Sequence, residues 1–418
     1  MIAGVTREPE AVPGFDPLCA EFVADPFPTL AQLRGQRPLF HAPALGCWVV
    51  TRYEDIVRVL DDPGTFSAAE AQRPLHPMCP RAAEILVDLR LVPTMSNCDP
   101  PEHQRYRSVM SRAMSPRRMA RLTPAIQERA SALLDRFADG LRADLVRELF
   151  YPLPASTIFT LIGFPPGDSD RIRTWCADKL EVNWGRPTEE QQIGSARGMV
   201  EFFRYCADFV ALRRAAPAND LTSDLIADER NLADPEITSL IFALSFAGHE
   251  TTTNLLGNAV YHLLSRPAVW DEIRADRSLV PGAVEETLRF DSSVPAWRRV
   301  TTRDTVLGGL RLPAGSRLVL SFAAADRQPE VFEQPDHFDI RRPNARRQLS
   351  FGRGIHLCLG AGLARTECEI VLNLLADRLA GLRLVRDQEI RFPANLSFRG
   401  PVTLWAQWDS DRSTDLPG

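Results

Sequence analysis

The sequence lacks the segments that export a protein or hold it in a membrane. Its first residues, MIAGVTREPEAVPGFDP, have neither the basic start nor the apolar stretch of a signal peptide. No apolar run approaches the roughly 20 residues that a membrane-spanning helix needs, and the longest candidates, such as residues 241–246, are short. We therefore expect a cytoplasmic protein that does not contact a membrane.

An excess of basic charge and paired cysteines are also missing. Lysine and arginine total 49 against 54 acidic residues, which argues against nucleic acid as a partner, because phosphate binding needs a basic surface. The eight cysteines include no C-x-x-C pair, which argues against zinc and iron–sulfur sites. A reducing cytosol further disfavours a disulfide framework.

The 418 residues contain no internal repeat and no low-complexity linker. We predict one domain over residues 1–418, with an extended segment at 1–24 and a disordered tail at 410–418. The pattern predicts a mainly α protein with a smaller, segregated β region. The predicted helices are 25–36, 53–62, 101–114 and several more up to about 265. The predicted strands are 48–52, two or more within 300–320 and one near 402–408, and residues 63–98 are predicted to be irregular.

One predicted helix carries a sequence that is unfavourable at its centre. It begins with Asp234 as N-cap and runs to Pro267, and its middle reads AGHETTT at 247–253. Glycine and successive β-branched hydroxyl residues are poor inside a helix. One interpretation is a helix exposed on that side, with threonines bonding back to carbonyls. The other is an opened turn where a small ligand lies beside hydroxyl and carboxylate groups.

A single cysteine, Cys358, follows a glycine-rich turn and precedes a segment with helical periodicity. Gly352, Gly354 and Gly360 permit positive φ and close approach of a ligand to the backbone. A helix N-terminus would stabilise a thiolate and lower the thiol pKa. A packed core thiol is the alternative for a cysteine taken alone.

The pattern F-G-x-G-x-H-x-C-x-G, from Phe351 to Gly360, resembles the haem-binding loop of cytochromes P450. The resemblance extends from about Asp25 to Asp409, and it is closest to the haem domains of bacterial enzymes fused to a flavin and iron–sulfur reductase. It implies the P450 fold, with a long central helix over haem b, and Cys358 as the axial ligand of the iron. It also implies haem contacts by Phe351, Gly352, Gly360 and Ala247.

Three further motifs match the family in order. Glu286-Thr287-Leu288-Arg289 resembles the family's E-x-x-R, with Arg342 as its downstream partner, and the resemblance gives these three charged residues a structural role. The haem propionates would be bound by His103, Arg107, Arg299 and His356, with Arg298 as the less favoured substitute for Arg299. The segment 247–252 resembles the oxygen-activation motif, which implies that Glu250 and Thr251 are catalytic and deliver protons. The family often has Asp where this chain has Glu250.

Motif offsets also suggest a substrate pocket, although each of its residues could equally be plain core. Most of the residues are apolar, which favours a small, largely apolar or aromatic substrate. They are Met95, Ser96, Ala243, Phe246, Val294, Pro295, Ala296 and Leu396.

The resemblance implies a monooxygenase that inserts one atom of O2 into this substrate by hydroxylation or O-dealkylation. Electrons would come from NAD(P)H through an external ferredoxin or a flavin/iron–sulfur reductase. The alternative is a haem-thiolate enzyme that does not hydroxylate, and instead performs oxidative coupling, nitration or peroxide-driven oxidation. A haem-based sensing module and a helical protein without haem are the remaining alternatives.

Overall fold

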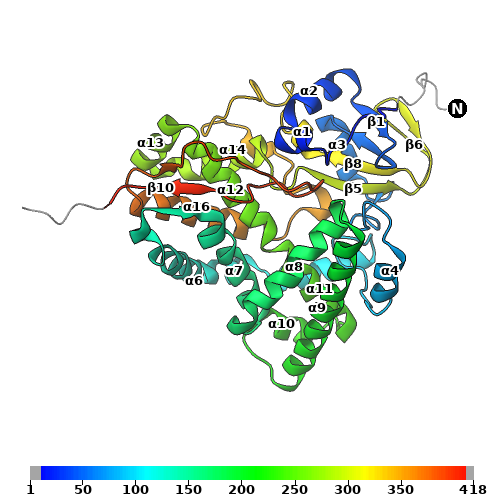
Figure 1. Cartoon of the computed structure of the whole chain (residues 1–418). Helices are drawn as coiled ribbons and strands as arrows, with labels where there is room; N and C mark the ends of the chain where they lie inside the picture. Colours follow the sequence, from blue (N-terminus) through cyan, green and yellow to red (C-terminus); the bar gives the residue numbers. More distant parts are fainter. Residues whose placement is uncertain (1–10, 411–418) are drawn as a thin grey trace, which may run out of the picture.

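The computed structural model of the chain describes residues 11–410. It is mainly α-helical with a smaller β region, as the sequence predicts (Figure 1). The helices are α1 (Ala20–Ala24), α2 (Phe27–Gln36), α3 (Tyr53–Asp61), α4 (Pro80–Leu86), α5 (Glu102–Ala113), α6 (Pro116–Asp135), α7 (Pro152–Ile162), α8 (Ser169–Trp184), α9 (Glu189–Ala215), α10 (Leu221–Ala227), α11 (Asp234–Ala247), α12 (Glu250–Leu264), α13 (Pro267–Ala275), α14 (Val280–Phe290), α15 (Phe322–Ala325) and α16 (Ala361–Arg378).

The β region consists of one five-stranded sheet and two small sheets. The larger sheet has the order β1-β2-β8-β5-β3, in which β2 and β8 are parallel and the other neighbours antiparallel. It lies with α1–α3 on one side of the molecule, and the helical part fills the other (Figure 1). The strands are β1 (Leu39–Ala42), β2 (Cys47–Val50), β3 (Phe66–Ser67), β4 (Arg142–Asp144), β5 (Ala296–Thr301), β6 (Thr305–Leu307), β7 (Leu310–Leu312), β8 (Arg317–Ser321), β9 (Arg383–Leu384) and β10 (Trp405–Gln407).

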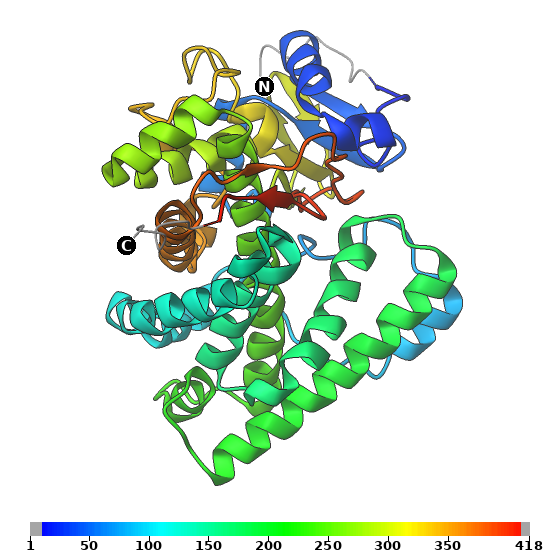
Figure 2. The same cartoon turned by 60° about the vertical axis from the view of Figure 1, so that its left-hand side comes forward.

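Helices α11 and α12 follow one another through the middle of the helical part (Figure 2). Helix α11 packs against α7, α8 and α9, whereas α12 packs against α7, α14 and α16. Two large hydrophobic clusters result. One joins α6, α12, α14 and α16, and the other, which we call the helical cluster, joins α5, α7, α8, α9 and α11 and contains Trp175, Phe202, Phe242 and Phe246. A third, the sheet-side cluster, contains Leu180, Trp184, Ala296 and Leu396.

The start of the long helix α9 is determined by its local sequence. Thr188 Oγ1 accepts a hydrogen bond from Gln191 N (3.3 Å), and Gln191 Oε1 accepts one from Thr188 N (2.8 Å). This reciprocal capping satisfies two backbone donors that a helix start leaves free. Helix α7 ends just before Gly163, whose φ of 102° is a conformation that residues other than glycine rarely adopt.

Several sequence predictions need correction. Residues 63–98 are not wholly irregular, because they contain β3 and α4. The segment 1–24, predicted as extended, includes helix α1, and its residues 1–10 lie outside the described residues, as do residues 411–418 of the predicted tail. The helix predicted from Asp234 is interrupted before Glu250, and Ala233 rather than Asp234 is its N-cap. Between residues 11 and 410, no helix combines the length and the apolar character needed to cross a bilayer.

Candidate functional site

The loop from Phe351 to Gly360 holds Cys358 on a tightly turned backbone. Gly352 and Gly354 both have φ of 68°, and a Cβ at Gly354 would lie 2.6 Å from the carbonyl oxygen of Leu60. Only glycine fits both conditions at that position. Cys358 N donates to the Phe351 carbonyl (2.9 Å), which closes the loop. Helix α16 begins three residues later, so the predicted placement of the sulfur just before a helix is confirmed, although the helix does not start at Cys358 itself.

The electrostatics of Cys358 differ from the sequence prediction. Burial raises the pKa of its thiol, and the opposing effects of the Gly360 and Ala361 N–H groups, Arg107 and Arg365 do not reverse this. Desolvation of a thiolate therefore outweighs the helix N-terminus in the protein alone. Cys358 nevertheless has solvent-accessible surface. Because the thiol is also desolvated by the surrounding protein, this surface faces a space enclosed by the protein. A metal cation in that space would favour the thiolate, because a coordinating thiol is deprotonated.

The predicted propionate-binding residues come together around two histidines. The rings of His103 and His356 meet edge to face with centroids 4.3 Å apart. Both nitrogens of the His103 ring and Nε2 of His356 are buried without a hydrogen-bond partner in residues 11–410. Arg299 is also buried, and its described hydrogen bond goes to the Arg298 carbonyl (2.7 Å). Buried N–H groups without a hydrogen-bond partner need an acceptor. The cluster of His103, His356 and Arg299 therefore fits a ligand that carries carboxylates.

Arg107 and Asp99 complete this region in different ways. Arg107 Nη1 donates to the Leu357 carbonyl (2.7 Å), which ties α5 to the cysteine loop. Asp99 accepts hydrogen bonds from Ser67 Oγ and from Ala68 N (2.9 Å). Its charge acts on His103, Arg299 and His356 alike. The sequence analysis missed Asp99, although its place four residues before His103 could have drawn attention to it.

Arg298 and Arg299 are adjacent on strand β5, but their side chains lie in different surroundings. Successive strand residues point to opposite faces. The charge of Arg299 acts on His103, and the charge of Asp99 acts on both residues. Arg298 instead donates to the Asn183 carbonyl (3.4 Å) and lies over the Trp184 ring. The geometry therefore favours Arg299, rather than Arg298, as the member of the histidine cluster.

The junction of α11 and α12 opens at Gly248 and His249, as the interpretation of an opened turn expects, and Thr251 bonds back to a carbonyl, as the other interpretation expects. A Cβ at Gly248 would lie 2.3 Å from Ile158 Cγ1, so glycine lets α7 approach. His249 is fully buried, and its Nδ1 donates to the Ser245 carbonyl (2.7 Å). Burial lowers the pKa of His249 to about 4, so this ring is neutral. Thr251 Oγ1 donates to the carbonyl of exposed Ala247 (3.0 Å).

The carboxyl group of Glu250 lies in surroundings that favour its protonated form. Burial raises its pKa to about 7, and the charge of Arg173 opposes the shift. Arg173 lies on α8 with its guanidinium 4.2 Å from the centroid of the Tyr151 ring, and Tyr151 is itself influenced by Glu250. A carboxyl group that titrates near neutral pH can both hold and release a proton. The sequence predicts neither Arg173 nor Tyr151, because only the packing of α8, which carries Arg173, and of the start of α7, which follows Tyr151, brings them here.

The raised pKa makes a prediction for Glu250→Gln. The wild-type carboxyl group stabilises the fold fully below the unfolded-state pKa of 4.5, and this contribution is lost as the pH rises through about 7. Glutamine does not titrate, so the melting temperature of the variant minus that of the wild type should increase between pH 4.5 and 7 and stay constant above. Thermal denaturation across pH 4–9 measures this difference. A difference that does not change with pH would show that Glu250 titrates normally.

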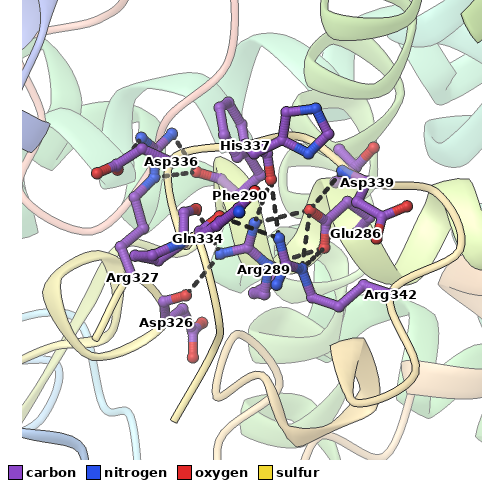
Figure 3. A network of polar contacts seen from close by, with 12 residues as sticks. Glu286, Arg289, Phe290, Asp326, Arg327, Gln334, Asp336, His337, Asp339 and Arg342 are labelled. Carbon is purple, nitrogen blue, oxygen red and sulfur yellow. Dashed lines mark hydrogen bonds and ion pairs between the residues drawn. The ribbon is translucent and has the colours of Figure 1, made fainter. Parts of the chain in front are cut away.

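The three predicted structural residues form one buried network (Figure 3). Arg289 Nη2 donates to Glu286 Oε1 (2.7 Å), and Arg342 Nε lies 3.1 Å from Glu286 Oε2. Arg289 also donates to the carbonyls of Asp326 and Pro335 (2.9 Å each). The network therefore joins α14 to the segment that leads into the cysteine loop.

The predicted pocket residues do not form a single described cavity. Phe246 and Met95 belong to the helical cluster. Pro295, Ala296 and Leu396 line a cavity of about 50 Å³ whose other walls include Phe15 and Phe22, at the N-terminal side of the sheet. The remaining pocket residues, Ser96, Ala243 and Val294, are partly buried. The Ser96 hydroxyl group is hydrogen-bonded to the side chains of Gln72 and Thr94. Sequence offsets alone did not reveal this division.

The assembled residues fit haem on structural grounds. Cys358 offers an accessible sulfur, the histidine cluster offers unpartnered buried donors to anionic groups, and Ala247 is exposed at the opened turn. Leu359, next to Cys358, packs against the same helical cluster as Phe246. The loop and the turn therefore border one region of the interior.

Comparison with known proteins gives a consistent result. A family model described as Cytochrome P450 matches residues 210–379. The chain is 37% identical over 394 residues to Nocardicin C N-oxygenase of Nocardia uniformis subsp. tsuyamanensis, covering 92% of this chain and 96% of that protein. Its structure is similar to that of cytochrome P450 CREJ in complex with (4-ethylphenyl) dihydrogen phosphate, with a TM-score of 0.91 and 36% identity over 95% of this chain and 99% of the other. It is also similar to an intact type IV self-sufficient cytochrome P450 monooxygenase, with a TM-score of 0.91 and 35% identity over 96% of this chain and 53% of the other.

Proposed function

The chain belongs to the cytochrome P450 family, and we propose that it inserts one atom of O2 into a small, largely apolar or aromatic molecule by hydroxylation or O-dealkylation. The observation that supports the proposal is the opened turn at Gly248 and His249, directly before Glu250 and Thr251. Phe246, before this turn, and Leu359, next to Cys358, belong to or pack against the same helical cluster. A sensing module would have no need of an acid and a hydroxyl group at this turn.

Cys358 would hold haem b through its sulfur, and the haem would supply the oxidising chemistry that thiolate ligation favours. The propionates would be held by His103, Arg299 and His356, with Arg107 bracing the loop. Phe351, Gly352, Gly360 and Ala247 would contact the macrocycle. These assignments rest on the unpartnered donors and the accessible surfaces described above.

Two residues at the α11–α12 junction, Glu250 and Thr251, would deliver protons. Glu250, with a pKa of about 7, holds a proton at neutral pH and can release it. Thr251 directs its hydroxyl hydrogen to the Ala247 carbonyl, which leaves the lone pairs of Oγ1 free to accept a proton-donating partner. Neutral, buried His249 fixes the turn through its hydrogen bond to the Ser245 carbonyl.

Small and apolar substrates are favoured by the predicted pocket residues Phe246 and Ala243, which lie on α11 before the turn. The solved relative that binds (4-ethylphenyl) dihydrogen phosphate, an aromatic molecule, supports this choice. Electrons would come from NAD(P)H through a ferredoxin or a flavin/iron–sulfur reductase. The reaction would take place in the cytoplasm, with neither a membrane nor nucleic acid as a partner.

Thr251→Ala tests the proposal. With a competent reductase and a bound substrate, the wild type should give a product that carries one oxygen from labelled O2. The variant should bind haem and consume NAD(P)H, but product formation should fall by roughly 10²-fold, the low end for positioned proton transfer, with the electrons recovered as hydrogen peroxide. Mass spectrometry of the product and a peroxide assay measure both.

The same experiment separates the alternatives. A wild-type product without label would favour oxidative coupling, nitration or peroxide-driven chemistry over oxygen insertion. Unchanged yield in Thr251→Ala would remove the threonine from proton delivery. Thr251→Ser, which keeps the hydroxyl group, is the matched control and should retain most of the yield.

A further inference from the structure

Lys179 is the only lysine in the sequence, among 49 basic residues. It lies on α8 with 6% of its surface exposed. Among the side chains that the structure describes, which do not include those of residues 177 and 178, the Lys179 ammonium group has no hydrogen-bond or ion-pair partner. A buried ammonium group without a counter-charge is unusual, because charged groups are rarely removed from water unless they are paired.

Aromatic rings surround this ammonium group. Lys179 Nζ lies 4.3 Å from the centroid of the Phe246 ring and 5.1 Å from that of Phe242. Burial lowers the pKa of Lys179 to about 8, so the group still carries its charge at neutral pH. The neighbouring Cys176 thiol is neutral, since burial raises its pKa. Attraction to ring faces offsets only part of the cost of removing a cation from water.

Among the described residues, buried Arg298 and Arg299 also form no ion pair, but each donates to a backbone carbonyl. Arg289 is paired with Glu286, and Arg399 with Asp291. Lys179 has the rings in place of a carboxylate. A purely structural position could be filled by an apolar side chain at lower cost, so the retained charge indicates a ligand.

The position of Lys179 on α8 indicates where such a ligand would lie. Helix α8 contributes Trp175 and Cys176 to the helical cluster and Leu180 and Trp184 to the sheet-side cluster. Lys179 therefore lies between the two groups of proposed pocket residues. Phe246, beneath its ammonium group, directly precedes Ala247 at the opened turn.

We propose that Lys179 binds an anionic end, a carboxylate or a phosphate, of a substrate whose apolar body extends toward the α11–α12 turn. This inference rests on the proposed monooxygenase function and specifies its substrate class. A charge-assisted contact with a buried ammonium group favours the anion strongly over its neutral analogue.

The test is a binding comparison with the haem-loaded enzyme. The probes are 4-alkylbenzoates and 4-alkylphenyl phosphates with alkyl chains of one to eight carbons, and the matching neutral 4-alkylbenzamides. Dissociation constants come from the shift of the haem absorbance and, independently, from titration calorimetry. The proteins are the wild type, Lys179→Met, Lys179→Arg and Arg171→Met, which removes a charge from the exposed face of the same helix.

The wild type should bind the best benzoate or phosphate at least tenfold more tightly than the amide of equal length. This preference should disappear in Lys179→Met and persist in Lys179→Arg and Arg171→Met, and the preferred anion should show whether a carboxylate or a phosphate is the natural end group. The inference fails if amides bind as tightly as anions, if the preference survives in Lys179→Met, or if no anion binds. In each of these cases the label incorporation test of the monooxygenase function is unaffected.

Discussion

Cys358→Ser is expected to remove the thiolate spectrum of the reduced, carbon-monoxide-treated protein and to reduce monooxygenase turnover below detection. The oxygen of serine is a much poorer donor of electron density to iron than a thiolate, and O–O cleavage depends on that donation. The substitution is small, and the loop hydrogen bond from the backbone N of residue 358 to the Phe351 carbonyl does not involve the side chain. Haem content, absorbance spectra and melting temperature measured together distinguish loss of ligation from loss of fold.

Cys19→Ser is the matched control, because Cys19 is also exposed and lies far along the chain from the loop. It should leave both the spectrum and turnover unchanged. An unaltered thiolate-type spectrum in Cys358→Ser would assign the iron ligand to another residue and would overturn the site described here.

The parts of the site predictable from sequence are those in which one short segment carries the chemistry. The loop from Phe351 to Gly360 and the turn around Glu250 are local, so their residue types and spacing are sufficient to recognise them. Glu286 and Arg289 are likewise three residues apart on one helix, and their pairing follows from that spacing. The predicted helices 25–36, 53–62 and 101–114 agree closely with α2, α3 and α5 for the same reason.

What the sequence could not predict depends on packing between distant segments. Lys179, Arg173 and Asp99 reach the site only because α8 and the loop before α5 fold onto it. The N–H groups near the start of α16 lower the pKa of Cys358, as the sequence predicts, but burial outweighs them and raises the pKa, and that desolvation depends on the tertiary structure. The division of the pocket residues between two clusters likewise follows from the tertiary structure.

Glu286→Gln is expected to lower the free energy of unfolding by about 3–5 kcal/mol, the usual cost of leaving a buried charge without its partner. Glu286 and Arg289 have fully buried side chains. The amide cannot neutralise Arg289 and Arg342, both of which lie against this carboxylate. Equilibrium urea unfolding measures the loss, and Glu84→Gln is the control. Its carboxylate also forms an ion pair three residues away, with Arg81, but the two side chains are 65% and 63% exposed, so the change should stay below about 1 kcal/mol.

The same substitution should also weaken haem retention, because the network lies next to the cysteine loop. Asp326, whose carbonyl accepts from Arg289, uses its carboxylate to accept from Leu349 N (2.9 Å), and Ser350 Oγ donates to the Leu288 carbonyl (2.6 Å). These bonds fix the two residues that precede Phe351. Haem loss to an excess of apo-myoglobin should therefore be faster in Glu286→Gln than in Glu84→Gln. Equal rates and equal stabilities in the two variants would show that the buried network contributes no more than an exposed pair.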